Sequence, residues 1–337
     1  MDIPVIDIAP FRLGGDGANV ARAWDTAMHG TGFAVIVGHG IPDGLLNGVY
    51  DRARAFFARP LDEKLQLSFA EKGRGQGYLP MGSEIVGRKQ DAQAKPDLCE
   101  SLTFANPRFD EKAPDNALDA RLYRANIWPD DMPGFRETVE AYMAAGRDLA
   151  LTLMRLSAVA LDLPPNYFKP FFDKMELNLR CVLFPDQPDA PEDHALRYGP
   201  HTDFSGFTIL RQDDAPGGLQ VKTTDGWRDV KQIPGTLVIN AGDLIQRWTN
   251  DRWVSNVHRV INPPPSFAPD GATDTSPTSG FAARGRRGAA RLSIVLFTGP
   301  NVDAQIATLP GCGESKYPPI LAGVHSEQRM RETYGAV

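Results

Sequence analysis

The first half of the chain alternates between helical and strand-like patterns of apolar residues. Residues 31–37 form a compact apolar run, which predicts a buried strand after an amphipathic helix that ends near residue 29. From 42 to 57 apolar residues recur at intervals of three and four, and the same spacing returns from about 133 to 161, so each segment predicts a helix with one face on a core. Residues 70–130 are richer in Gly, Pro and charge and predict loops with short elements.

Beyond residue 175 short strand-like runs separated by turns replace this pattern. Spacings of this kind are typical of an all-β sandwich or barrel of the jelly-roll type. No low-complexity linker separates the helical half from the strand-rich half, so we expect one α+β unit. The predicted strands are residues 179–184, 201–210, 218–222, 236–240, 243–248, 254–260 and 291–297.

A segment rich in Pro, Gly, Ser and Thr, residues 263–290, interrupts the strand-rich half. Its length is compatible with a mobile lid over a site and equally with a surface loop. Arg286 and Arg287 within it could meet an acidic substrate, although exposed arginines in loops are usually only solvated.

Composition and charge exclude several classes of protein. The 337 residues, 42% of them hydrophobic, can bury a sizeable core. The net charge is -6 and no long basic stripe is present, so nucleic acid is not an expected partner. The sequence has no secretory leader pattern and no apolar run of membrane-spanning length, which predicts a cytoplasmic protein without a membrane partner. Cys99, Cys181 and Cys312 are odd in number and widely spaced, which predicts reduced thiols.

Three residues of the second half have the types and spacing of a metal site. His201 and Asp203 are two residues apart in a predicted strand, so both side chains would point to one face and could hold one ion. His258, in another predicted strand, could supply the third ligand. Two histidines and one carboxylate leave adjacent positions open, as in non-haem Fe(II) oxygenases, whereas a closed zinc site needs a fourth protein ligand. The alternative is a polar cluster that stabilises a barrel.

Arg291 and Ser293 share a face of the last predicted strand. A guanidinium beside a hydroxyl suits a carboxylate held by charge-assisted hydrogen bonds. If the oxo-acid end of 2-oxoglutarate chelated the metal, Arg291 could neutralise its far carboxylate, and one metal position would remain for O2. A plain structural ion pair is the alternative for Arg291.

The remaining polar residues near these motifs have simpler interpretations. Asn240 and Asp243 are interpreted as turn residues. His194 lies in a loop that leads to His201 and could line the entrance of a site. The other histidines, His29, His39 and His325, are interpreted as structural or surface residues.

These motifs resemble the isopenicillin N synthase-like family of Fe(II)/2-oxoglutarate-dependent oxygenases almost from end to end. In the first half the matching motifs are Ile3-Pro4-Val5-Ile6-Asp7, Gly32-Phe33, His39-Gly40-Ile41-Pro42, Phe56-Phe57 with Lys64, Gly77-Tyr78, Lys95-Pro96-Asp97 with Glu100, and Asn126-Ile127-Trp128-Pro129. In the second half they are His201-Thr202-Asp203, Gly217-Gly218-Leu219-Gln220-Val221, Asn240-Ala241-Gly242-Asp243-Leu244, Trp248-Thr249-Asn250-Asp251, His258-Arg259-Val260 and Arg291-Leu292-Ser293.

The resemblance implies a double-stranded β-helix core of the jelly-roll, cupin-like type with a helical N-terminal flank. Residues 1–172 would form the flank as part of the same unit, 173–300 the catalytic core with the insertion 263–290, and 301–337 a C-terminal segment and helix. It also implies that the ligands of the metal are His201, Asp203 and His258. Arg291 and Ser293 would bind the carboxylate of the co-substrate.

The implied activity is oxidation of a small molecule with Fe(II), 2-oxoglutarate and O2, releasing succinate and CO2. Hydroxylation is expected, with desaturation or cyclisation as variants. Two alternatives stay open, which are a 2-oxoglutarate-independent iron oxidase of the same family and a non-catalytic small-molecule-binding protein. A zinc hydrolase would need a general base, and no motif offers one. No oligomeric state is predicted.

One position departs from the family pattern. Many members have a tyrosine before the proline that ends the strand at 179–184, and its hydroxyl contacts 2-oxoglutarate. The residue here is Phe184, so one hydrogen bond to the co-substrate is expected to be missing, which keeps the oxidase alternative open.

Overall fold

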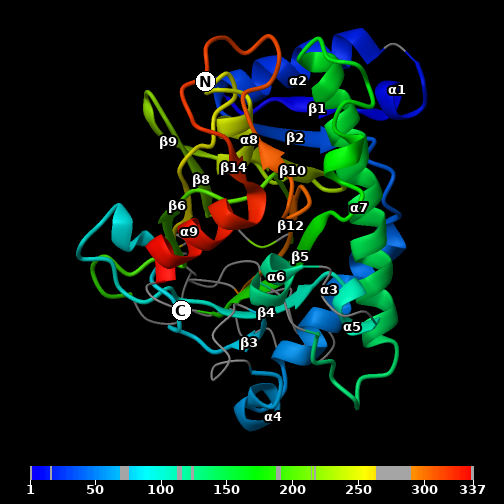
Figure 1. Cartoon of the computed structure of the whole chain (residues 1–337). Coiled ribbons are helices and arrows are strands. Elements are labelled where there is room, and N and C mark those ends of the chain that lie inside the picture. Colours follow the sequence, from blue (N-terminus) through cyan, green and yellow to red (C-terminus); the bar gives the residue numbers. More distant parts are fainter. Residues whose placement is uncertain are drawn as a thin grey trace.

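An eight-stranded sheet crosses the middle of the molecule (Figure 1). In spatial order its strands are β1 (Val5–Asp7), β2 (Phe33–Val37), β10 (Leu237–Ala241), β7 (Phe207–Gln212), β12 (Arg291–Gly299), β5 (Glu176–Phe184), β4 (Glu100–Ala105) and β3 (Gly77–Leu79). Neighbouring strands are antiparallel except β1 and β2, which are parallel. Strands from both halves of the chain therefore share one sheet.

A four-stranded sheet packs against part of the large sheet. Its order is β6 (Tyr198–His201), β11 (His258–Val260), β8 (Leu219–Thr223) and β9 (Gly226–Asp229). Apolar side chains of the two sheets, among them Leu210, Val182, Leu219 and Val260, form one buried cluster. The two facing sheets are the expected double-stranded β-helix core of an α+β protein.

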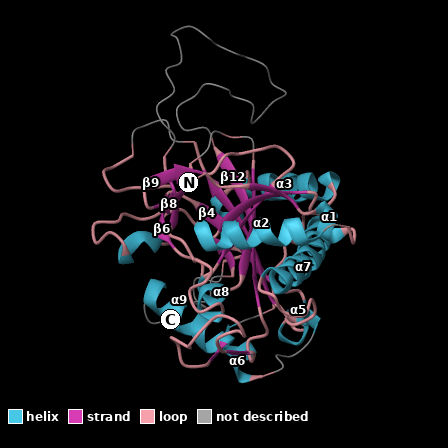
Figure 2. Ribbon diagram, turned by 90° about the horizontal axis from the view of Figure 1, so that it is seen from above, coloured by secondary structure: helices cyan, strands magenta, loops and turns pink. Residues whose placement is uncertain are grey.

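Long helices cover the outer face of the large sheet, and Figure 2 shows α3 and α7 on one side of the strands. The α-helices are α1 (Ala9–Arg12), α2 (Gly17–Gly30), α3 (Asp43–Phe57), α4 (Leu61–Leu65), α5 (Arg108–Glu111), α6 (Ala117–Leu122), α7 (Phe135–Ala160), α8 (Asp243–Trp248) and α9 (Ala322–Tyr334). Two 3-10 turns, η1 (Val86–Lys89) and η2 (Lys169–Phe171), and the short pair β13 (Gln305–Ile306) and β14 (Ile320–Leu321) complete the described elements.

The large sheet is buried on both faces because successive side chains of its strands point to opposite sides. In β2, Phe33 and Val35 belong to the cluster between the sheets, whereas Ala34 and Ile36 belong to the cluster under the helices. The side chains of β5 alternate between the same two clusters. The strands of the large sheet are therefore rich in apolar residues at consecutive positions, which is why the sequence shows continuous apolar runs instead of alternation.

The computed structural model describes residues 2–15, 17–68, 76–111, 116–122, 125–186, 191–213, 215, 218–262 and 290–334, with only the backbone of 111, 119 and 121. The predicted strand at 31–37 and the helices ending near 29 and spanning 42–57 and 133–161 are confirmed by β2, α2, α3 and α7. The predicted insertion 263–290, with Arg286 and Arg287, lies outside the described residues apart from its last position.

Three predicted strands are corrected. Residues 243–248 form the helix α8, because Leu244, Ile245 and Trp248 are the buried positions, and this spacing is helical. The run 201–210 is two strands, since β6 ends at residue 201 and β7 begins at 207. Of the run 254–260, only the last three residues are a strand.

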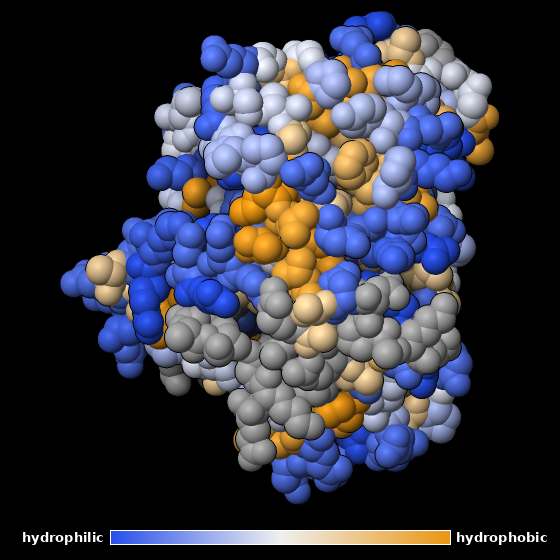
Figure 3. Space-filling view, in the orientation of Figure 1, coloured by the Kyte–Doolittle hydropathy of each residue, from blue (hydrophilic) through white to orange (hydrophobic). Residues whose placement is uncertain are grey.

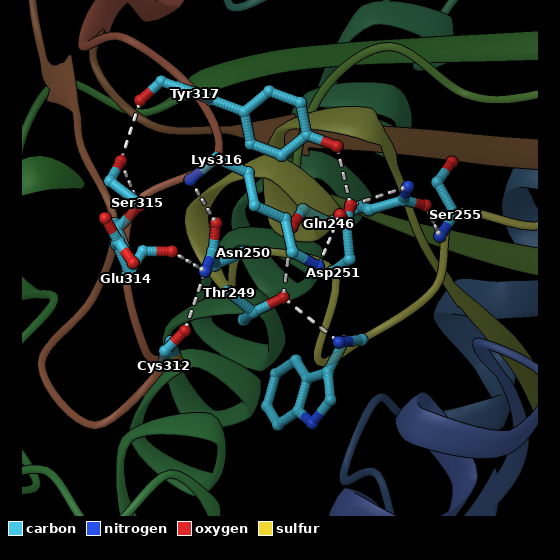
Figure 4. Close-up of polar contacts among 12 residues, drawn as sticks. Gln246, Thr249, Asn250, Asp251, Ser255, Cys312, Glu314, Ser315, Lys316 and Tyr317 are labelled. Atoms are coloured by element: carbon cyan, nitrogen blue, oxygen red, sulfur yellow. Dashed lines mark hydrogen bonds and ion pairs between the residues drawn. The ribbon is translucent and has the colours of Figure 1, made fainter.

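The C-terminal segment is attached to the core through the turn after α8, as Figure 4 shows. Asn250 has a left-handed backbone, with φ of 53°, and its Nδ2 donates hydrogen bonds to the carbonyls of Cys312 and Glu314, both at 2.8 Å. Its Oδ1 accepts the backbone N–H of Lys316 at 2.9 Å. Asp251 accepts the Tyr317 hydroxyl at 2.7 Å. This clamp fixes the loop that precedes β14 and α9.

The visible surface is mostly hydrophilic, with a smaller group of apolar residues at the centre of the face in Figure 3. No helix in the part of the chain that the structure describes is both long and apolar enough to cross a membrane. The three cysteines are free thiols, as predicted, and Cys99 and Cys181 are buried.

Candidate active site

The three predicted metal ligands lie together at one end of the space between the sheets. His201 is the last residue of β6 and pairs directly with His258, the first residue of β11. Asp203 lies in the loop after β6, and its Oδ1 is 3.7 Å from Nε2 of His201 and 3.8 Å from Nε2 of His258. The three ligand atoms lie within 4.8 Å of one another, which is close enough to hold one ion.

The prediction that one continuous strand places His201 and Asp203 side by side is wrong. His201 and Asp203 do not share the face of a continuous strand, because the strand ends at His201. The turn that follows depends on Gly206, whose N–H donates to the carbonyl of Thr298 at 2.8 Å. A Cβ at residue 206 would lie 2.5 Å from that carbonyl oxygen, so only glycine fits. The loop, and not the strand pleat, brings Asp203 beside the histidines.

Hydrogen bonds orient each ligand. Nδ1 of His201 is 2.8 Å from the carbonyl of Gly199, and Nδ1 of His258 is 3.1 Å from the carbonyl of Asn256. A carbonyl can only accept, so Nδ1 is the donor in both rings, and Nε2 is the ring nitrogen that lies on the side of Asp203. Asp203 is oriented by hydrogen bonds to the second oxygen of its carboxylate.

Asp203 Oδ2 accepts the Thr208 hydroxyl at 2.5 Å and the Asn240 amide at 2.6 Å, which leaves Oδ1 facing the histidines. Asn240 is 3% exposed and lies in β10 opposite Thr208 of β7. The interpretation of Asn240 as a turn residue is therefore wrong. A buried amide at the end of an apolar strand was the signal that could have found it, because such a group needs a polar partner.

The loop that carries Asp203 is fixed by the beginning of α8. The N–H groups of residues 242, 243 and 244 donate to the carbonyls of residues 206, 203 and 205 at 2.7, 2.8 and 3.2 Å. The Asp243 carboxylate also accepts Ser255 at 2.6 Å, Arg329 at 2.7 Å and Thr202 at 3.2 Å. Asp243 is thus the first residue of a helix that supports the loop at residues 202–206, and not a turn residue as expected.

The protonation states of this cluster suit a divalent cation. Burial and, after it, the neighbouring His258 lower the pKa of His201 to about 3, so the imidazole of His201 is neutral at physiological pH. Burial alone would raise the pKa of Asp203. The two histidines and the hydrogen bonds from Asn240 and Thr208 outweigh burial, so the pKa of Asp203 is lowered and the carboxylate is ionised. The site therefore offers one negative charge and a neutral imidazole without losing a proton.

Arg291, the first residue of β12, is buried with unused hydrogen-bonding capacity. It is 1% exposed, and its Nη2 donates to Gln212 Oε1 at 2.7 Å. Nε and Nη1 have no hydrogen-bond partner among the described residues. Ser293 lies two residues further on the same face and is 4% exposed. A buried guanidinium in this state needs an anion, and a carboxylate meets that need with two parallel hydrogen bonds.

One cavity connects Arg291 with the metal cluster. Its volume is about 240 Å³, and its lining includes the three candidate ligands, Arg291 and Ser293. The lining also includes apolar side chains from the cluster between the two sheets: Val182, Leu210, Leu219, Val260 and Val295. The residues present therefore fit an Fe(II) ion at the His, Asp and His cluster and a short dicarboxylic acid that also contacts the arginine.

The other histidines are not part of this site. His194 is exposed and its Nδ1 lies 2.9 Å from the Asp91 carboxylate, so the structure does not bring it to the described cavity lining. His29 and His39 contact backbone carbonyls at 2.9 and 3.2 Å, and His325 is buried in α9.

Two facing sheets with a His, Asp and His cluster and a buried arginine lining the same cavity are the arrangement of a mononuclear non-haem iron oxygenase. Residues 3–131 match the family described as non-haem dioxygenase in morphine synthesis N-terminal, and residues 175–300 match the 2OG-Fe(II) oxygenase superfamily. The chain belongs to this superfamily of Fe(II)- and 2-oxoglutarate-dependent oxygenases, in its isopenicillin N synthase-like branch.

Relatives match along nearly the whole chain. The 2-oxoglutarate-Fe(II) type oxidoreductase hxnY of Emericella nidulans is 32% identical over 98% of this chain and 90% of its own. A homoarginine-6-hydroxylase of Oryza sativa subsp. japonica is 29% identical over 97% of this chain and 96% of its own. A full-length Neurospora crassa protein, crystallised in complex with alpha-KG, superposes with a TM-score of 0.80 at 29% identity, covering 97% of this chain and 95% of that one.

These findings confirm the expected class of enzyme. It is an Fe(II)- and 2-oxoglutarate-dependent dioxygenase that uses O2 and acts on a small molecule, with release of succinate and CO2. The double-stranded β-helix fold is confirmed in the same way.

Proposed function

We propose that His201, Asp203 and His258 bind the Fe(II), and that Arg291 with Ser293 binds the far carboxylate of 2-oxoglutarate. The observation that carries the proposal is the buried guanidinium of Arg291, with two nitrogens unpartnered among the described residues, in the same cavity as the ligand cluster. Bound iron supplies the chemistry that couples decarboxylation of 2-oxoglutarate to oxidation of the substrate. The reaction is hydroxylation, with desaturation or cyclisation as variants.

The protein's own residues bind, orient and exclude water. The two histidines and Asp203 would hold the metal as three protein ligands, and positions would remain for the co-substrate and O2. Asn240 and Thr208 keep the second carboxylate oxygen occupied. The apolar side chains of the cavity lining would exclude water from a bound co-substrate, which would strengthen its charge pair with Arg291.

The alternatives differ in what meets Arg291. A 2-oxoglutarate-independent oxidase would place the substrate's own carboxylate there. Solved relatives with 2-oxoglutarate bound, such as the Neurospora crassa protein with alpha-KG and JOX2 with 2OG, Fe and JA, favour the co-substrate. A binding protein without activity would have no need of the aligned ligand set.

The proposal is tested by anaerobic titration of the Fe(II)-loaded protein with 2-oxoglutarate. We expect a weak visible charge-transfer band as the chelate forms, and slow production of succinate once oxygen is admitted. Tightly bound iron without this band would contradict 2-oxoglutarate binding and favour the oxidase. Failure to bind iron at all would contradict the ligand assignment.

The phenylalanine that departs from the family pattern gives a second test. Phe184 is 3% exposed, pairs with Arg291 across the strands, and its ring centre lies 5.9 Å from the guanidinium carbon. Phe184→Tyr should lower the apparent KM for 2-oxoglutarate about two- to tenfold, because one neutral hydrogen bond contributes about 0.5–1.5 kcal/mol. Phe11→Tyr, outside the cavity in α1, is the matched control. An unchanged or higher KM would mean that residue 184 does not face the co-substrate.

We also propose that the enzyme acts in the cytoplasm on a small molecule and not on nucleic acid. Three free thiols suit a reducing compartment, and the net charge of -6 disfavours a polyanion. Fractionation of cells that produce the native protein would test the compartment, and recovery in a membrane or secreted fraction would contradict it.

A further inference from the structure

The cavity wall beside the metal cluster contains an ion pair that the chemistry above does not use. Glu84 Oε2 accepts a hydrogen bond from Nη2 of Arg180, and both side chains are nearly buried, at 10% and 11% exposure. Arg180 also donates to the hydroxyls of Tyr198 at 2.9 Å and Ser101 at 3.0 Å. The Tyr198 ring meets the ring of His201 edge-on, with centroids 4.8 Å apart. The pair is therefore next to the reacting end of the cavity.

Backbone contacts hold Glu84 in this position. Its carbonyl accepts the N–H of Asp97 at 2.9 Å, and the buried Asp97 carboxylate accepts the N–H groups of Val86 at 2.9 Å and Gly199 at 2.8 Å. The two backbones touch, because a Cβ at residue 199 would lie 2.6 Å from the nitrogen of Gly87. The segment that carries Glu84 is thus attached to β6, the strand of His201. The hydrogen bonds around Glu84 hold its backbone in one place, as is required of a residue that binds a ligand in a defined geometry.

The pair leaves one charged acceptor available to the cavity. Glu84 uses Oε2 for Arg180, and its Oε1 makes no hydrogen bond with any described residue, while Glu84 lines the cavity. A carboxylate oxygen in a nearly buried wall needs a donor. A second cation would lie close to Arg180 and an anion close to Glu84, so the pair disfavours both. A neutral donor satisfies the oxygen without either repulsion.

We propose that Glu84 is a substrate-binding residue, and that the substrate presents a neutral N–H group to its Oε1, as an amide, lactam or ureide does. The inference rests on the proposed function, since it takes the cavity beside His201 as the place where the substrate reacts. The cavity of about 240 Å³ also has to hold 2-oxoglutarate, so the substrate is small.

The test uses small planar probes and the whole protein loaded with Zn(II) and 2-oxoglutarate, in which no turnover occurs. 3-methyl-2-pyridone carries an N–H, and N-methyl-2-pyridone has the same atoms without it. Ligand-observed NMR should give an affinity at least about tenfold higher for the N–H isomer, because a hydrogen bond to a charged group is lost in the other. Benzamidine and benzoate, the charged probes, should bind no better than the N-methyl isomer.

Equal affinities of the two pyridones, or tighter binding of either charged probe, would overturn the proposal. The variant Glu84→Gln keeps an acceptor without its charge and should reduce the preference for the N–H isomer to a few-fold. Glu176→Gln, which removes another carboxylate that lines the cavity, is the matched control and should keep the full preference. If Glu176→Gln lost the preference and Glu84→Gln kept it, Glu176 and not Glu84 would be the residue that binds the N–H group, and the proposal would be wrong.

The probe comparison on the unaltered protein stands even if Glu84→Gln fails to fold. The proposed function is scored separately, by the binding of 2-oxoglutarate to the Zn(II)-loaded protein without any probe. A protein that prefers the N–H isomer but does not bind 2-oxoglutarate would contradict the proposed function and leave the role of Glu84 standing.

Discussion

His201→Ala should reduce turnover of 2-oxoglutarate by about a thousandfold or more, because loss of a ligand removes the metal and the several kcal/mol of stabilisation that it gives the reaction. The side chain of His201 is 18% exposed and lies at the end of a strand, so the fold should survive its loss. The measurement is succinate production in buffers with controlled metal content, together with the iron bound per protein.

His194→Ala is the matched control, since it removes an exposed histidine whose contact is a carboxylate on the surface. It should leave succinate production and iron content unchanged. Full activity of His201→Ala under the same conditions would contradict the ligand assignment.

Asp203→Ala should also be inactive, but it leaves the buried donors of Asn240 and Thr208 without their acceptor, at a cost of about 1–3 kcal/mol each in stability.

Arg291→Gln should raise the apparent KM for 2-oxoglutarate about 30-fold or more, because two charge-assisted hydrogen bonds in a buried site contribute about 2–3 kcal/mol. The maximal rate at saturating co-substrate should change less, since Arg291 is not one of the proposed metal ligands. Steady-state succinate assays over a wide range of 2-oxoglutarate concentration give both values.

Stability measurements separate this role from a structural one. A buried guanidinium with two unpartnered nitrogens costs free energy, so Arg291→Gln should leave the free energy of unfolding unchanged or raise it when 2-oxoglutarate is absent. Arg228→Gln, on the exposed strand β9, controls for the loss of one positive charge. A lower melting temperature with an unchanged KM would make Arg291 a structural residue.

The proposed ligand set and Arg291 could be named from the sequence because each belongs to a short motif with its own chemistry. His201 and Asp203 are neighbours in sequence, and Arg291 and Ser293 are too. An amide in an apolar strand indicates that Asn240 needs a polar partner but not which one, because Asp203 is brought to it by the pairing of β10 with β7. Sequence spacing carries no information on that pairing.

The ion pair of Glu84 and Arg180 in the cavity wall could not be predicted from the sequence for the same reason, because it depends on contacts between distant segments. Glu84 and Arg180 are 96 residues apart, and neither lies in a recognisable motif, so only the folded chain brings them together. The wrongly predicted strand at 243–248 has a local cause, because a six-residue segment with three apolar residues is too short for its periodicity to separate a strand from a helix. The helix is favoured because the carbonyls of residues 203, 205 and 206 accept the N–H groups at the beginning of α8.

The attachment of α9 has a consequence for the order in which the enzyme is built. Ser326, Met330 and Thr333 of this helix line the cavity, and Arg329 donates to Thr202, the residue between His201 and Asp203. The strands that carry the proposed metal ligands precede α9 in the sequence, so during translation they leave the ribosome before α9 does. The proposed ligands can therefore come together while the side of the cavity that α9 contributes is still missing. We expect the metal-binding side of the cavity to form first and the side lined by α9 to form last.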